Sequence, residues 1–177
     1  MNQPNQQSEK QSGEQGRSKE QPIEHQRLLE WWHALADNRG DRAALRRASS
    51  VQQVMFNPGF HRLWHRLRNT RWNRSERVAL IAALAARIKQ NDARKPFAAQ
   101  LGSPPAGREK AVLSGLRFRR LLQTSLSDDL LQACSRAIAI RNGQANIVNL
   151  AESVYWWNDR VHRQWAFDYY AANPSAD

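Results

Sequence analysis

Apolar residues recur at three- and four-residue intervals along most of the chain beyond residue 23. This spacing places them on one side of an α-helix, as is typical of helices packed against a core. No segment alternates apolar and polar residues as a half-buried strand would, and no repeat of about 20–50 residues is present. The pattern therefore predicts an all-α protein. Its clearest helix runs to about residue 90, with a buried face of Val78, Ile81, Leu84, Ala85 and Ile88.

Local start and stop signals divide this pattern into successive helices. Ser50 and Ser127 are expected to cap helix N-termini, because a hydroxyl accepts a hydrogen bond from a free backbone N–H. Gly40 and Gly143 are expected to end helices, since glycine readily adopts the left-handed conformation that follows a helix. After a pair of prolines, a helix is expected to resume near Glu109.

The segment 101–108, "LGSPPAGR", is the main break in the pattern. Two prolines and two glycines cannot lie in the interior of a stable helix. We therefore expect two small helical domains joined by this Pro/Gly-rich linker: an N-terminal helical unit at 23–100 and a C-terminal helix bundle at 109–173. Residues 1–22 are almost entirely polar and are expected to form a disordered tail, because they have little apolar surface to bury.

Composition excludes several classes of protein. No apolar run approaches the roughly 18 residues of a membrane-spanning helix, and the N-terminus lacks the pattern of a secretory signal peptide. A single cysteine, Cys134, rules out an internal disulfide framework, and its place in an apolar stripe indicates a core residue. We therefore expect a cytoplasmic protein with no membrane partner.

Residues that could support catalysis or metal binding do not form a recognised site. His61 and His65 would share a helix face, but no third ligand lies nearby and arginines flank the pair. Asp128 and Asp129 are adjacent, so they diverge by about 100° on a helix and are better suited to helix capping. The sequence contains no P-loop, GxGxxG or GxSxG motif. We expect a protein that is not an enzyme and that needs no metal or cofactor.

Charge changes the picture most. The net charge is +11, and the 27 basic residues comprise 22 arginines and 5 lysines. A guanidinium can contact a phosphate through two parallel hydrogen bonds and can stack on a base, which favours a nucleic-acid partner. A GC-rich genome would also raise the ratio of arginine to lysine. It would not explain the excess of basic over acidic residues.

The arginines are clustered. The stretch 61–77 holds six of them and one acid, and Arg71, Arg74 and Arg77 surround the expected start of a helix. A helix N-terminus already carries partial positive charge, so further cations there lower stability unless an anion such as phosphate binds. Arg74 and Arg77 are therefore candidate nucleic-acid contacts.

Further basic clusters recur in both halves of the chain. Each one is either a solvated helix face or part of a track for a nucleic-acid backbone. No element resembles a reader of base sequence, so backbone binding independent of sequence is the expectation. The further clusters are Arg42, Arg46 and Arg47; Arg94 and Lys95; Arg117, Arg119 and Arg120; Arg136 and Arg141; and Arg160 and Arg163.

The seven tryptophans divide into two groups. Four lie in helical apolar stripes and are expected to pack in the core. The other three are less well explained by the stripes, and one of them could stack on a base. The first group is Trp32, Trp64, Trp157 and Trp165, and the second is Trp31, Trp72 and Trp156.

Three segments, taken together, resemble a known family. Residues 28–63 carry a Trp-bearing helix, a short turn, the arginine pair of "RRAS" and then "NPGFHRL". Residues 117–123 ("RFRRLLQ") and 154–170 ("VYWWNDRVHRQWAFDYY") follow. Their order and spacing resemble the CasB family, the small subunits of the type I-E CRISPR Cascade complex.

The resemblance implies a non-catalytic role in antiviral defence. Small subunits of this family sit as a head-to-tail pair between the large subunit and the backbone subunits that hold the CRISPR RNA. Their basic surface supports the duplex of guide RNA and target DNA and holds the displaced strand, which stabilises the R-loop. The residues that match the family's nucleic-acid contacts are Arg47, Arg120 and Arg136, with Arg74 and Arg160 as further candidates.

Two alternatives stay open from the residues alone. A helical protein that binds nucleic acid on its own, without sequence preference, would need the same basic surface. An adaptor could use that surface to bind acidic proteins. A steep salt dependence of binding would favour nucleic acid over an acidic partner, and co-purification with an RNA-bearing complex would favour the Cascade role.

Overall fold

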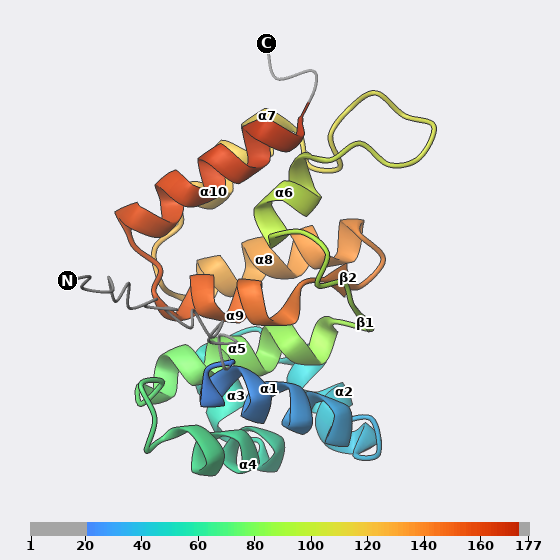
Figure 1. Ribbon diagram of the computed structural model, residues 1–177. Helices are drawn as coiled ribbons and strands as arrows, with labels where there is room; N and C mark the ends of the chain where they lie inside the picture. Colours follow the sequence, from blue (N-terminus) through green and yellow to red (C-terminus); the bar gives the residue numbers. More distant parts are fainter. Residues whose placement is uncertain (1–20, 174–177) are drawn as a thin grey trace, which may run out of the picture.

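The computed structural model describes residues 21–173, so the predicted tail at 1–22 lies almost wholly outside the described residues. Helices dominate this part of the chain (Figure 1), which confirms the predicted all-α class. In chain order they are α1 (Ile23–Ala34), α2 (Arg39–Arg47), α3 (Val51–Met55), α4 (Pro58–Leu67), α5 (Ser75–Arg87), α6 (Phe97–Gly102), α7 (Gly115–Leu122), α8 (Asp128–Ile140), α9 (Ile147–Tyr155) and α10 (Asp159–Ala172).

Helix α5 lies at the centre of the molecule. Every residue from 78 to 86 is buried, and α5 contacts α2, α3 and α4 as well as α8 and α9. Figure 1 shows α5 between the lower helices α1–α4 and the pair α8 and α9 above it. The predicted buried face is confirmed, but the helix is buried on all sides, because both halves of the chain pack on it.

The capping predictions are confirmed in part. The Ser50 hydroxyl accepts from the Gln53 N–H at 3.3 Å, and the Ser127 hydroxyl accepts from the Asp129 N–H at 3.2 Å. Gly143 has a φ of +84° and closes the end of α8. The prediction for Gly40 is wrong: it lies inside α2, because the turn after α1 is completed by residues 35–38 and a new helix begins at Arg39.

The structure also corrects the segment predicted as a linker. Leu101 and Gly102 are the last residues of α6, and both are buried where α6 packs against α10. The helix expected from Glu109 begins only at Gly115, since the preceding residues form turns and an irregular connection. The division into two domains stays a prediction, although the buried residues of both halves form one connected core.

A short parallel pair of strands, which the sequence pattern did not predict, joins the two halves. β1 (Gln90–Asn91) pairs with β2 (Gln144–Ala145), with Gln90 opposite Gln144. Two residues are too few to show an alternation of apolar and polar side chains. The pairing places the end of the α5 segment beside the turn between α8 and α9.

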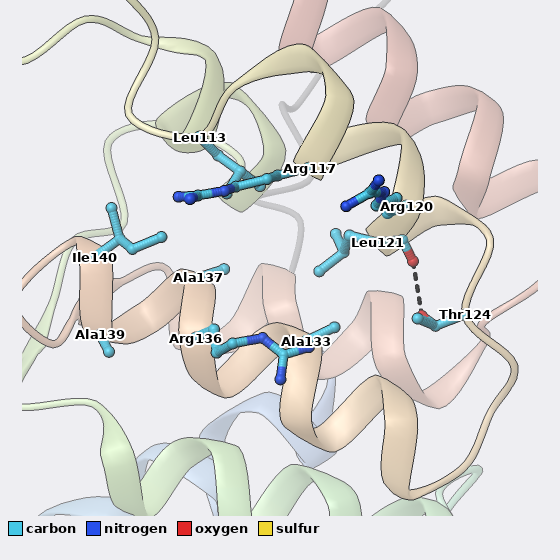
Figure 2. A pocket seen from close by; sticks show the side chains of 10 residues that line it. All are labelled: Leu113, Arg117, Arg120, Leu121, Thr124, Ala133, Arg136, Ala137, Ala139 and Ile140. Carbon is cyan, nitrogen blue, oxygen red and sulfur yellow. Dashed lines mark hydrogen bonds between the residues drawn. The ribbon is translucent and has the colours of Figure 1, made fainter.

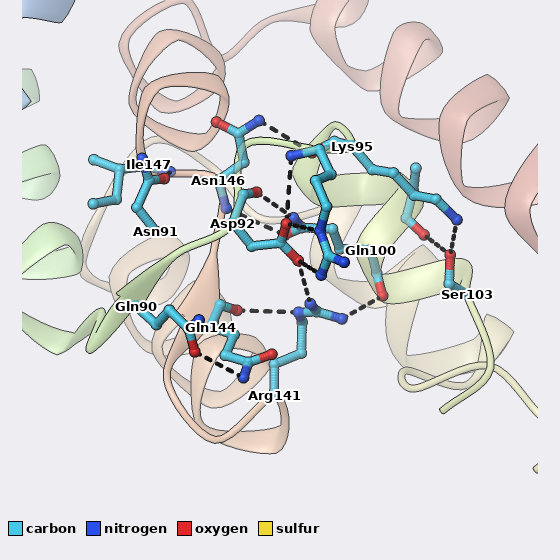
Figure 3. Close-up of polar contacts among 12 residues, drawn as sticks. Gln90, Asn91, Asp92, Lys95, Gln100, Ser103, Arg141, Gln144, Asn146 and Ile147 are labelled. Atoms are coloured by element: carbon cyan, nitrogen blue, oxygen red, sulfur yellow. Dashed lines mark hydrogen bonds and ion pairs between the residues drawn. The ribbon is translucent and has the colours of Figure 1, made fainter. Parts of the chain in front are cut away.

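A polar network next to these strands holds the junction together (Figure 3). The Gln100 amide donates to the Asp92 carbonyl at 2.7 Å and accepts from the Asn146 N–H at 3.2 Å. The Asp92 carboxylate accepts from Arg94 at 2.8 Å and forms an ion pair with Arg141 at 3.7 Å. Arg141 is only 12% exposed, so this arginine serves the fold and is not available as a surface cation.

The Asp92 network should give a pH-dependent contribution to stability. The hydrogen bond from Arg94 holds the pKa of Asp92 below its ordinary value, and Arg141 adds to this, although burial acts in the opposite direction. An Asp with a lowered folded-state pKa stabilises the fold above its unfolded pKa, and this is lost as pH falls through the folded value. Asp92→Asn should therefore lower the free energy of unfolding by about 1 kcal/mol at neutral pH.

The difference between wild type and Asp92→Asn should shrink as pH falls below about 4, the ordinary pKa of Asp, and through the lower folded-state pKa, where the folded carboxyl loses its charge. Urea unfolding at neutral pH and at about pH 3 measures both values. A difference that stays constant across this range would contradict the assignment of stability to the ionised carboxylate.

The tryptophans are mainly structural. Of the three that the stripes left unexplained, Trp31 and Trp72 are buried, and the Trp31 indole donates to the Gly59 carbonyl at 2.9 Å. Trp156 is 37% exposed, and its indole donates to Glu152. Among the four expected in the core, Trp157 and Trp165 are buried, whereas Trp32 and Trp64 are only partly covered.

Candidate nucleic-acid interface

A basic-rimmed hollow of about 590 Å³ lies between α7 and α8. Figure 2 shows Arg117 and Arg120 reaching over it from α7, with Arg136 on the opposite helix, α8. We call this feature the α7–α8 hollow. Besides these arginines and Thr124, it is lined by Leu113, Leu121, Ala133, Ala137, Ala139 and Ile140.

The sequence of α7 accounts for its position. Phe118 and Leu121 are buried, while Arg117 and Arg120, three residues apart, share an exposed side of the helix. Phe118 stacks on Tyr169 of α10, with ring centroids 3.9 Å apart and the planes tilted by 8°. This stacking fixes α7 on α10, so that both guanidinium groups project beside α8.

Two further hollows continue from the first. A hollow of about 320 Å³ shares Ala139 with the α7–α8 hollow and is lined by Arg46, Arg87 and Lys89. A third, of about 400 Å³, shares Arg46 and Lys89 with the second. We call the cations that line these three hollows the basic row: Arg39, Arg42, Arg46, Arg87, Lys89, Arg117, Arg120 and Arg136.

The basic row contains no neutralising acid. No Asp or Glu lines any of the three hollows, and none of the row's cations forms an ion pair within residues 21–173. The arginine–carboxylate pairs lie elsewhere, at Arg62–Asp41, Arg66–Glu30, Arg71–Glu24, Arg71–Glu152, Arg94–Asp92 and Arg141–Asp92. The row therefore retains its positive charge and is suited to a polyanion.

Part of this charge is fixed in place by the fold. The Arg87 guanidinium donates to the carbonyls of Ala83 and Ala48, both at 2.7 Å, and of Leu45 at 3.0 Å. Burial lowers the pKa of Arg87, and the nearby charge of Arg46 lowers it further. Arginine nevertheless stays protonated in proteins, so the floor of the row holds a cation that its hydrogen bonds keep in position.

The described residues offer little for other kinds of site. No cluster of three or more His, Cys, Asp or Glu side chains that could hold a metal occurs among them. Burial raises the pKa of the Cys134 thiol to about 12, so it stays protonated at neutral pH. None of their helices has the length and apolar character needed to cross a membrane.

Comparison with known proteins identifies the family. The family CRISPR-associated protein Cse2 matches residues 41–170, which is most of the chain. The chain belongs to the Cse2 family. A search of curated protein sequences gives no match.

Two solved structures share the fold of this Cse2-family chain. One is a crystal structure of E. coli Cascade bound to a PAM-containing double-stranded DNA target, with a TM-score of 0.63 and 19% identity over 85% of this chain and 99% of that one. The other is CasB from Thermus thermophilus, with a TM-score of 0.58 and 24% identity over 84% of this chain and 98% of that one. At these identities the likeness shows the fold alone.

Three of the six predicted site residues of this Cse2-family chain lie at or beside the basic row. Arg120 and Arg136 meet at the α7–α8 hollow. Arg47 is exposed at the end of α2, next to Arg46 of the basic row, and is not itself among the lining residues. These three arginines form no hydrogen bond or ion pair through their side chains within residues 21–173. Their contact with nucleic acid stays a prediction.

The other three lie near the start of α5 and at the start of α10. Arg77 donates to the Tyr155 carbonyl, and its guanidinium lies 5.6 Å from the centre of the Tyr155 ring. Its neighbour Arg71 is paired with Glu24 and Glu152, so this cluster is partly occupied within the chain. Arg74 and Arg160 are exposed. Nucleic-acid contact at these positions also stays a prediction.

Several cations of the basic row were not among the predicted site residues. Arg117 could have been found, because its three-residue spacing from Arg120 places the two on one face. Arg39, Arg42 and Arg46 have a similar helical spacing along α2. Lys89 gives no such signal, since it follows α5 and joins the row only through the packing of α2 and α8 around that helix.

Proposed function

We propose that this chain is the small subunit of a CRISPR RNA-guided Cascade complex and that it acts without catalysis in antiviral defence. In this role it binds the backbone of guide RNA, target DNA and the displaced strand through the basic row. Its partners are the large subunit, the subunits that carry the CRISPR RNA, and a second copy of the same chain. Membership of the Cse2 family and a fold shared with a Cascade crystal structure support this assignment.

The observation that carries the nucleic-acid role is the acid-free basic row across both halves of the chain. A small-molecule anion would need a single pocket, whereas three adjoining cationic hollows suit an extended polyanion. Formation of an R-loop is nearly balanced in free energy, because the new hybrid replaces a DNA duplex of similar stability. A few additional backbone contacts are then enough to favour the open state.

Co-purification tests the assignment. When the tagged chain is co-expressed with the other Cascade subunits and a CRISPR RNA, we expect it to recover a complex that contains both the large subunit and the RNA. Recovery of the chain without RNA or partner subunits would contradict the proposal.

In the recovered complex, Arg47→Ala/Arg120→Ala should leave assembly intact, because exposed side chains contribute little to folding. The same double variant should shorten the lifetime of the bound target DNA, because two cations beside the strand are lost.

A further inference from the structure

We propose that the α7–α8 hollow receives one unpaired nucleobase from the strand whose backbone follows the basic row. This inference rests on the proposed function, because it specifies the ligand at part of the same surface. The hollow of about 590 Å³ falls within the range of roughly 300–1,000 Å³ that is typical of small-molecule sites. It is thus large enough for a chemical group that a flat cationic surface would not hold.

The lining of the hollow distinguishes it from a simple phosphate site. Phosphate contacts require only exposed cations. The third hollow is of this kind, since it is lined by arginines, a lysine and two alanines. The α7–α8 hollow instead combines its arginines with apolar side chains, including Ile140, which is 43% exposed. An apolar floor beneath cations matches a nucleotide, whose base is a flat ring and whose phosphate is an anion.

The arginines at the rim can serve both parts of a nucleotide. A guanidinium stacks on the face of a base and also donates paired hydrogen bonds to a phosphate. Arg117 and Arg120 reach over the hollow from α7, and Arg136 lies on the α8 side (Figure 2). None of the three forms a hydrogen bond or ion pair through its side chain with another described residue. All three are therefore free to reorient around a ligand.

Charge favours a nucleic acid over a partner protein as the occupant. An apolar side chain from a protein would fill the floor but would leave three cations unneutralised. The next hollow, which shares Ala139 with this one, is also cationic. This arrangement suits a nucleic-acid strand, which carries one negative charge per nucleotide. Paired bases are stacked inside a duplex and cannot enter, so this site should select single strands.

The experiment compares two single-stranded probes of equal length and charge: an oligothymidylate and a strand of abasic deoxyribose units. Fluorescence anisotropy with the full chain gives both affinities. Wild type should bind the base-bearing strand about fivefold more tightly, at the low end of what one stacked base contributes, because no aromatic ring lines the hollow. Equal affinity of wild type for the two strands would overturn the proposal.

Two variants test whether the preference for the base-bearing strand arises at the α7–α8 hollow. Ala133→Leu fills the floor with an aliphatic group that does not stack on bases, and Ile140→Asn removes apolar surface at an exposed position where folding is little affected. Both should abolish the preference for the base-bearing strand while keeping the salt dependence of wild type. Ala34→Leu, at an exposed position of α1 outside the three hollows, should retain the preference.

The outcomes separate this inference from the proposed function. If Arg117→Gln/Arg120→Gln/Arg136→Gln weakens both strands but neither Ala133→Leu nor Ile140→Asn alters their ratio, the basic row binds backbone and the base site is wrong. If the arginine variant binds both strands as wild type does, the nucleic-acid role of the row fails as well. If the Ala133→Leu variant no longer co-purifies with a Cascade subunit but retains the wild-type preference for the base-bearing strand, the hollow contacts a protein. That result would also overturn the inference.

Discussion

Replacement of Arg46, Arg120 and Arg136 together by glutamine should weaken binding of single-stranded DNA by about 100-fold at 0.1 M salt. Each phosphate contact contributes about −0.7 to the slope of log affinity against log salt, so the loss of three contacts reduces the slope by about 2. The affinities of wild type and variant should converge near 1 M salt, where this contribution is largely screened, and a slope difference of about 2 then gives about 100-fold at a tenfold lower concentration. Titrations over a series of salt concentrations measure both quantities.

A matched variant controls for net charge. Arg68, Arg108 and Arg163 are exposed, carry no side-chain hydrogen bond or ion pair within residues 21–173 and line none of the three hollows. Their replacement by glutamine removes the same charge. The resulting loss of affinity for single-stranded DNA should be severalfold smaller than the loss in the first variant. Equal losses in the two variants would show that total charge matters rather than the basic row.

Gly102→Ala should strongly destabilise the fold, although it adds only one methyl group. A Cβ atom at Gly102 would lie 2.2 Å from the Tyr169 carbonyl oxygen and 3.0 Å from the carbonyl carbon. These are backbone atoms of α10, so no side-chain rotation relieves the clash and α6 must move away from α10. We expect the free energy of unfolding to fall by about 3 kcal/mol, at the upper end of the usual cost of overpacking.

Gly40→Ala is the control for this substitution. Gly40 lies inside α2, and an added Cβ would meet no atom within 4 Å. Gly40 is the second residue of α2 and does not have a positive φ, so alanine fits there without strain and restricts the unfolded chain, and this variant should be more stable than wild type by about 0.4–1 kcal/mol. Urea unfolding of both variants tests the contrast. Near-wild-type stability of Gly102→Ala would contradict the close approach of α6 and α10.

The fold could be predicted from the sequence where the signal is local. Helical spacing and the capping residues Ser50 and Ser127 predict elements that the structure confirms. The role of Gly102 could not be predicted, because a glycine at a helix–helix contact has the same local sequence signal as a glycine in a linker. The difference depends on Tyr169, which is far away along the chain. The strands β1 and β2 are likewise produced by packing and not by pattern.

The sequence predicts that the candidate site is rich in arginine, but it predicts only some of the arginines that line it. The sequence shows the excess of arginine, but it cannot distinguish an arginine that faces solvent from one that binds buried carbonyls. Arg87 and Arg141 belong to the second kind, and their partners include residues distant in the chain. Arg120 and Arg136 meet because Phe118 holds α7 in place on α10, a contact that depends on the tertiary structure.

The separation of paired from unpaired arginines has a kinetic consequence. Carboxylates neutralise cations at Arg62, Arg66, Arg71 and Arg94. The basic row instead gathers eight cations with no carboxylate partner among the described residues along three adjoining hollows, so unneutralised charge is concentrated there more than at the separate unpaired arginines outside the row. In the electric field of a polyanion, such a molecule experiences a torque that turns its unneutralised face forward before contact. Many collisions are thereby oriented productively, and the rate of capture of a strand becomes sensitive to ionic strength.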